Sequence, residues 1–134
     1  MIAITLALFL ADPSVLGPIG RQAMPAKGCA AFLWDTAPTR KLVAMATADP
    51  ARLRLHLDGK TVDVARGGER GSAGFGFAGV TEYRGADVTV VLDMAVQTRP
   101  ELTGGGVVPA GTLRVERAGR DVLVTPVAGL IGCA

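Results

Sequence analysis

Few side chains in this chain are suited to covalent chemistry. His56 is the one histidine, and Ser72 is the only serine beyond residue 17. Ser72 lies in the sequence RGSAG, which lacks the first glycine of the G-x-S-x-G turn that presents a serine nucleophile in hydrolases. The carboxylates Asp63 and Asp93 lie on the polar faces of predicted strands, where water solvates them. We therefore predict no catalytic residue and no enzymatic activity.

The residue types also argue against a metal or a nucleotide cofactor. Zinc sites need spaced Cys or His ligands, and calcium loops need a D-x-D-x-D-G pattern, neither of which occurs. Residues 74–79 (GFGFAG) match the dinucleotide pattern G-x-G-x-x-G. That motif must open a helix, whereas here it leads into the predicted strand VTEYR. We expect a glycine-rich loop with a bulged strand, no metal site and no cofactor.

The two cysteines, Cys29 and Cys133, bracket the strand-rich part of the chain. An even number of cysteines in an exported protein favours a disulfide over free thiols. Closing a loop of about 100 residues would stabilise the fold by roughly 4–5 kcal/mol on the chain-entropy model. We predict this bridge, and two separate buried thiols or a lipid-anchored Cys29 are the alternatives.

The N-terminal segment indicates export. Residues 2–11 are apolar apart from Thr5, and Asp12-Pro13 ends the run. Such a run is too short to span the ~30 Å hydrocarbon layer as a helix, but it fits the apolar part of a signal peptide. We predict a signal peptide over residues 1–17, an extended arm over 18–28 and a β-domain over 29–134, with an extracytoplasmic location (periplasmic or secreted). A buried first strand and an uncleaved membrane anchor are the alternatives.

The composition limits the domain count and the partners. The 134 residues suffice for one domain, whose core must be aliphatic because 49% of residues are hydrophobic and only 4% aromatic. The net charge of +2 is too small for a dedicated nucleic-acid binder. We expect a monomer with an unknown protein or small-molecule partner, no nucleic acid and no integral membrane span.

From Cys29 onward the dominant hydrophobic period is two. Residues 52–57 (RLRLHL) and 60–66 (KTVDVAR) flank Asp58-Gly59, the strongest short signal for a hairpin with a type I′ turn. A two-residue turn pairs Leu55 with Val62 and Arg54 with Asp63. A second hairpin, with strands at residues 111–117 and 121–128, is expected around Ala118-Gly119. It would place Leu113 opposite Val124 and Val115 opposite Val122.

Further strands are expected at residues 29–34, 41–47, 75–83 and 87–97. The fold class is therefore all-β, with about eight antiparallel strands forming either a flattened up-and-down barrel or a β-sandwich. A bridge between the chain ends slightly favours the barrel.

Two features could contact a ligand. Trp34 shares a strand face with Phe32 and Ala30, which predicts a core position, and a surface aromatic for sugar or peptide contact is the alternative. The loop 67–74 (GGERGSAG) is glycine-rich and charged, and such loops on a rigid scaffold often carry binding residues. Arg70, Ser72 and the nearby Tyr83 are the candidate binding residues.

The LDGK turn, the segment GSAGFGF and the strand EYRGADVTVVL resemble the strand–loop–strand order of periplasmic lysozyme inhibitors. That resemblance implies an exported eight-stranded barrel whose serine- and glycine-rich loop enters the enzyme's cleft. The chain departs from the family pattern, with one serine in the loop, no tyrosine at the expected place and an extra C-terminal hairpin. We expect a binding or envelope-accessory protein; a small-molecule binder inside a barrel and a lysozyme-inhibitor-like protein are the alternatives.

Overall fold

A computed structural model describes residues 15–134 of the chain, and within this range it contains strands and turns but no helix. The strands are β1 (Leu16–Gly17), β2 (Cys29–Asp35), β3 (Leu42–Ala48), β4 (Ala51–Leu57), β5 (Lys60–Arg70), β6 (Val80–Gly85), β7 (Val88–Thr98), β8 (Gly105–Arg117) and β9 (Leu123–Cys133).

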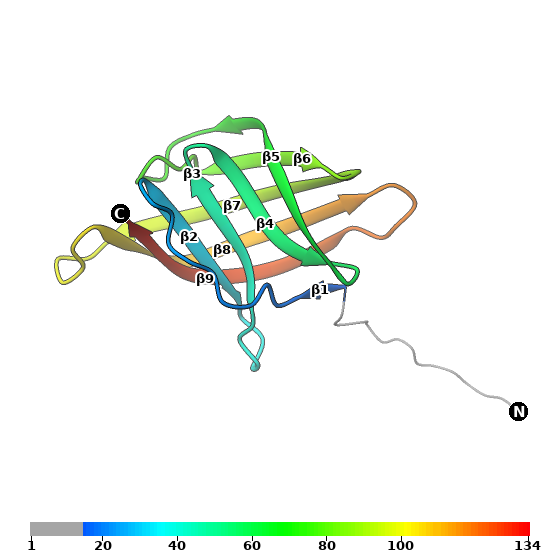
Figure 1. Cartoon of the computed structure of the whole chain (residues 1–134), viewed down its shortest axis with the longest axis horizontal. Coiled ribbons are helices and arrows are strands. Elements are labelled where there is room, and N and C mark those ends of the chain that lie inside the picture. The colour runs from blue at the N-terminus through cyan, green and yellow to red at the C-terminus, as the bar shows by residue number, and fades with distance from the viewer. Residues whose placement is uncertain (1–14) are drawn as a thin grey trace, which may run out of the picture.

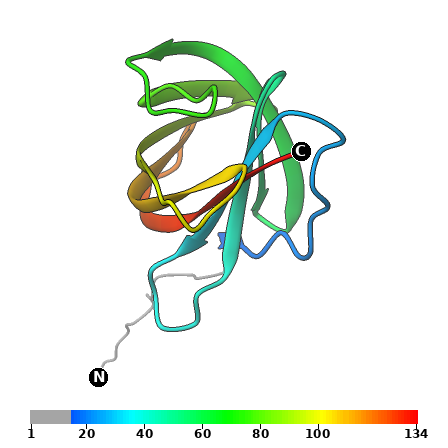
Figure 2. The same cartoon turned by 90° about the vertical axis from the view of Figure 1, so that its left-hand side faces the viewer.

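Strands β2 to β9 form a closed antiparallel barrel (Figure 1). Each strand pairs with the next along the chain, and β9 pairs with β2 to close the ring. Figure 2, which looks toward the end that carries the C-terminus, shows these strands curving around a common axis. The all-β prediction is confirmed, and of its two forms the structure has the up-and-down barrel.

The β4–β5 hairpin has the predicted register. Leu55 pairs with Val62, and Arg54 pairs with Asp63. Asp58 and Gly59 have φ angles of 52° and 82°, the positive values that a type I′ turn requires at both central positions. The prediction succeeds because the turn sequence and the period of two on both strands specify the same pairing.

The register predicted for the β8–β9 hairpin is wrong by one residue on β9. Val115 pairs with Leu123, and Leu113 pairs with Thr125. Gly119 has a φ of 72° while Ala118 keeps a negative φ, and the N–H of Arg120 donates to the carbonyl of Arg117. This is the pattern of a type II turn, whose backbone twist does not match that of the strands, so the loop is longer than two residues. As a result Val122 and Val124 lie exposed on the outside.

The barrel interior is filled by side chains from all eight barrel strands, mostly aliphatic, with Tyr83 as the contribution of β6. The buried core cluster includes Ala31, Leu33, Ala44, Ala46, Leu53, Leu55, Val64, Tyr83, Val90, Leu92, Met94, Val108, Leu113, Val115, Val127 and Ile131. Eight strands give an interior just wide enough for side chains to fill, and the alternation of each strand supplies them.

The glycine-rich segment covers one end of the barrel. Strand β5 extends to Arg70, and residues 71–79 then form a tight loop in which Phe75 and Gly76 have φ angles of 57° and 86°. Phe77 is only 6% exposed and belongs to the core cluster. The predicted strand over 75–83 therefore begins later, at Val80, because the preceding residues turn back over the barrel end.

The predicted disulfide is present. Cys29 and Cys133 are directly paired on β2 and β9 and are bonded to each other. The bridge therefore lies at the seam where the first and last barrel strands meet.

The N-terminal arm runs along the outside of the barrel before it enters β2. Leu16 pairs with Leu57 at the end of β4, and the N–H of Ile19 donates to the carbonyl of Leu42. The predicted signal peptide falls mostly outside the described residues, so its cleavage stays a prediction. Within residues 15–134 no helix is long and apolar enough to cross a membrane.

Candidate functional site

The three residues predicted to bind a ligand do not share one surface. Arg70 and Ser72 are exposed, at the end of β5 and in the loop that follows it. Tyr83 is 1% exposed and points into the barrel. Burial raises the pKa of Tyr83 to about 12, partly offset by a hydrogen bond with Thr81. The structure therefore leaves Arg70 and Ser72 as neighbours on the loop and places Tyr83 in the core.

The prediction that Trp34 and Phe32 are core residues is wrong. Alternation on β2 directs Ala31 and Leu33 inward, so the two aromatic side chains lie on the outer face, where both are partly exposed. Both faces of β2 are apolar, and period alone could not decide which one faces the core. The alternative interpretation of Trp34, a surface aromatic, matches its position.

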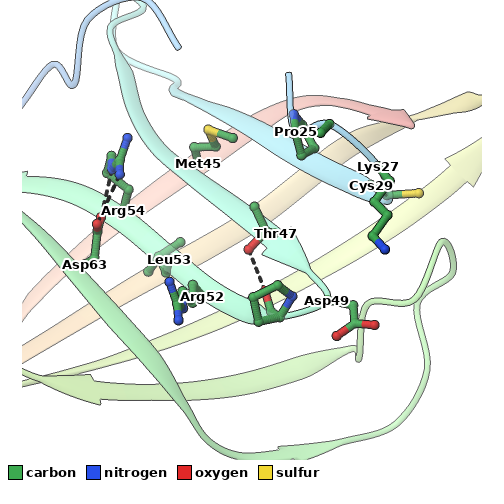
Figure 3. A pocket seen from close by; sticks show the side chains of 12 residues that line it. Pro25, Lys27, Cys29, Met45, Thr47, Asp49, Arg52, Leu53, Arg54 and Asp63 are labelled. Atoms are coloured by element: carbon green, nitrogen blue, oxygen red, sulfur yellow. Dashed lines mark hydrogen bonds and ion pairs between the residues drawn. The ribbon is translucent and has the colours of Figure 1, made fainter. Parts of the chain in front are cut away.

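A groove of about 360 Å³ lies between the N-terminal arm and the outer face of β3 and β4 (Figure 3). Pro25 and Lys27 of the arm form one wall, and Met45 lies on the sheet side. Arg52 and Asp49 are charged residues that also line it. The groove thus combines apolar surfaces with charged groups.

Arg54 fixes the arm over this groove. Its Nε donates to Asp63 Oδ1 at 2.8 Å and one terminal nitrogen donates to Asp63 Oδ2 at 3.1 Å, so the pair is bidentate. The other terminal nitrogen donates to Gln22 Oε1 on the arm at 2.9 Å. The hydrogen bonds between Arg54 and Asp63 raise the pKa of Arg54 and lower that of Asp63. The arm is therefore held in its middle as well as at both ends.

A second groove, of about 470 Å³, lies on the outer face of β2, β9 and β8. Trp34, Val107 and Leu130 supply its apolar surface. Among the described residues that line it, Arg40, from the turn between β2 and β3, is the only charged one. Leu130 is 51% exposed.

The two grooves are joined by a row of apolar residues that are paired across four strands. Met45 on β3 pairs with Phe32 on β2, Phe32 pairs with Leu130 on β9, and Leu130 pairs with Val107 on β8. Side chains at directly paired positions lie on the same face of a sheet. We refer to Met45, Phe32, Leu130, Val107 and Trp34 together as the outer apolar face.

Sequence reasoning missed most of this face. The predicted last strand ended at residue 128, before Leu130. Residues 127–131 (VAGLI) are apolar on both faces of the strand, so they carried a signal for an apolar outer surface. Without the barrel register that signal could not be assigned to the outside.

Among the described residues no cluster of three or more His, Cys, Asp or Glu side chains could hold a metal ion. No family model, curated protein or solved structure matches this chain.

Proposed function

We propose that this chain is an exported binding protein that contacts a protein partner through its outer apolar face. The observation that carries the proposal is the row of apolar side chains from Met45 to Val107, paired in register across four strands on the outside of a closed barrel. Isolated apolar side chains are common on protein surfaces, whereas a contiguous group marks an interaction site.

The chemistry of the face suits a protein–protein contact. Aromatic residues, Met and Arg are enriched where interfaces bury most of their binding energy. Trp34 and Arg40 supply two of these types in the second groove, and Phe32 and Met45 continue the apolar face from there to the arm groove. The four strands that carry the face belong to a closed barrel, and each is paired along both edges. The face is therefore rigid and loses little conformational entropy on binding.

The charges around the face favour an acidic partner. Lys27 and Arg52 line the arm groove and Arg40 lines the other groove, and none of the three forms an ion pair with a described residue. Asp49, which also lines the arm groove, is likewise without an ion pair among the described residues, so these four groups carry a net charge of +2. A partner with an apolar centre and carboxylates at its rim would complement this surface and would be steered toward it.

The filled interior favours the outer surface over a ligand inside the barrel. Leu53, Leu55, Val90, Leu113 and Val115 are fully buried against one another and occupy the space that such a ligand would need. The export part of the proposal is supported by the disulfide, because such bonds persist in oxidising compartments.

Site-specific photo-crosslinking in the native host tests the proposal. The photoreactive residue p-benzoylphenylalanine replaces Leu130 in one variant and Val124 in the control. Val124 is 55% exposed on the same strand but lies outside both grooves. We expect position 130, and not 124, to form an adduct with one acidic protein of the envelope fraction. The added substitution Met45→Asp, which places a charge on the face, should abolish that adduct.

Three outcomes would contradict the proposal. The first is the same adduct from both positions, and the second is no adduct from position 130. The third is an adduct of twice the chain's mass, which would show that the face joins two copies of this chain.

A further inference from the structure

The end of the barrel opposite the disulfide carries a basic cavity that the outer apolar face does not include. This cavity, of about 650 Å³, lies among the β4–β5, β6–β7 and β8–β9 turns. Its apolar wall is formed by Leu57, Val62 and Val88. The charged residues that line it are Asp58, Lys60, Asp87, Arg117 and Arg120. We call this cavity the barrel mouth.

Arg117 lies deep in the mouth because of the strand period. Leu113 and Val115 are core residues of β8, and Arg117 is the next residue of the same inward row. It pairs directly with Val88, and its side chain is only 11% exposed. The guanidinium of Arg117 therefore occupies an inward-facing position of β8, whereas the two preceding inward-facing positions hold the aliphatic side chains of Leu113 and Val115.

Arg117 has an unmet hydrogen-bonding requirement. One terminal nitrogen donates to Asp58 Oδ2, but the Nε–H is buried and has no partner among the described residues. Leaving a buried donor of a charged group unpaired is costly, and such a group in a native protein calls for a partner, such as an ion or water.

The charges of the mouth do not balance. Arg120 also approaches the carboxylate of Asp58, at 3.4 Å, so two guanidiniums share one carboxylate. Lys60 adds a third cation, while Asp87 forms no ion pair with a described residue. With three cations and the two carboxylates of Asp58 and Asp87, the residues that line the mouth carry a net charge of +1. The two arginines beside Asp58 also repel each other, and a bound anion would reduce that repulsion.

We propose that the barrel mouth binds an oxyanion group, a carboxylate or a phosphate, carried by a ligand whose apolar part lies against Leu57, Val62 and Val88. The planar guanidinium groups of Arg117 and Arg120 match both oxyanions in geometry. This site is at the end of the barrel and the outer apolar face is on its wall, so the two proposals stand independently.

NMR of the folded protein, labelled with ¹⁵N-arginine, tests the site directly. Inorganic phosphate is titrated in one series and sodium octanoate in the other, at ionic strength held constant with NaCl. We expect the Arg117 Nε–Hε signal to shift and saturate in at least one series. Tighter binding of octanoate would assign a carboxylate with an apolar tail, and tighter binding of phosphate would assign a phosphate ligand.

Two variants separate a specific site from general charge effects. Arg120→Gln removes a cation of the mouth that is largely exposed, so the fold is retained, and it should weaken binding at least fivefold. Arg114→Gln is the control. Arg114 is exposed on β8, the strand that carries Arg117, and it pairs with Glu116 outside the mouth. Two results would overturn the proposal. One is an Arg117 signal whose shift stays linear with ligand concentration in both series, and the other is binding that is weakened equally by Arg120→Gln and by Arg114→Gln.

Discussion

Tyr83 is the only tyrosine of the chain, and its phenol lies inside the barrel. Burial disfavours the charged phenolate, which raises the pKa of Tyr83 from 10.0 to about 12. Because the folded value lies above the unfolded one, this group contributes stability below pH 10 that is lost as the pH rises toward 12.

The absorbance of phenolate at 295 nm reports on this residue alone. We expect a midpoint near 12 for the folded protein, and a midpoint near 10 for the same protein unfolded in urea. A midpoint near 10 in the folded protein would mean that the phenol is exposed to water, contrary to the structure.

Asp58 combines a turn position with a charge at the barrel mouth. The hydrogen bond from Arg117 lowers the pKa of Asp58 below its ordinary value of 3.8. A depressed folded value means that the carboxylate adds stability above pH 3.8, and that this stability is lost as the pH falls through the folded pKa.

The variant Asp58→Asn isolates this effect, because Asn-Gly also favours a type I′ turn. Urea unfolding between pH 2 and 6 should show that the wild-type protein loses more stability on acidification than the variant does. Equal pH profiles for the two proteins would show that the Asp58–Arg117 pair contributes nothing measurable to stability.

At the scale of single elements, the β2–β9 pairing depends on a glycine. Gly129 pairs with Leu33, and a Cβ at position 129 would overlap the carbonyl oxygen of Phe32 on the neighbouring strand. Backbone atoms of a paired strand cannot move away without breaking the ladder. Gly129→Ala should therefore destabilise the protein by about 2–3 kcal/mol, in the range of other overpacking substitutions.

Gly68→Ala is the matched control for this substitution. Gly68 also lies in a strand, but a Cβ there would meet no atom within 4 Å, and its φ is not in the left-handed region. Urea melts should show a near-normal midpoint for Gly68→Ala and a clear loss for Gly129→Ala. Equal midpoints would show that β2 and β9 are not as closely paired as the structure has them.

The elements differ in how far the sequence determines them. The β4–β5 hairpin could be predicted in full because Asp58-Gly59 fixes a two-residue turn and each strand has one apolar and one polar face. The β8–β9 register could not, because Ala118-Gly119 forms a type II turn and valines occupy both faces of the strand that follows it. Trp34 was misplaced for the same reason, since an apolar period on both faces does not distinguish inside from outside.

At the scale of the whole molecule, the fold class followed from the hydrophobic period of two, whereas the positions of the cysteines only slightly favoured a closed barrel over a sandwich. The candidate site did not follow, because the outer apolar face joins four strands, from Met45 to Val107. Its residues meet only through the barrel register. Local patterns determine pairs of strands well, whereas a surface that crosses several strands depends on every register between them.

The barrel closes through two kinds of interaction at its seam, the β2–β9 ladder and the disulfide. The ladder pairs seven residues of β2 with β9, from Cys29 to Asp35, so we expect the folded barrel to stay closed without the bridge. The disulfide acts mainly on the unfolded chain, where it restrains a loop with a sequence separation of 104 residues. On the chain-entropy model, its removal should cost about 4–5 kcal/mol of stability.

Urea unfolding of Cys29→Ala and of the double variant Cys29→Ala/Cys133→Ala tests this account. Both should lose the same stability, because either one removes the whole cross-link. Their unfolding should also depend more steeply on urea, since an unfolded chain without the bridge exposes more surface. Thiol titration of the unfolded, non-reduced wild-type protein from its native compartment should find no free thiol. Two free thiols there, or an unchanged stability in the variants, would show that the ladder alone closes the barrel.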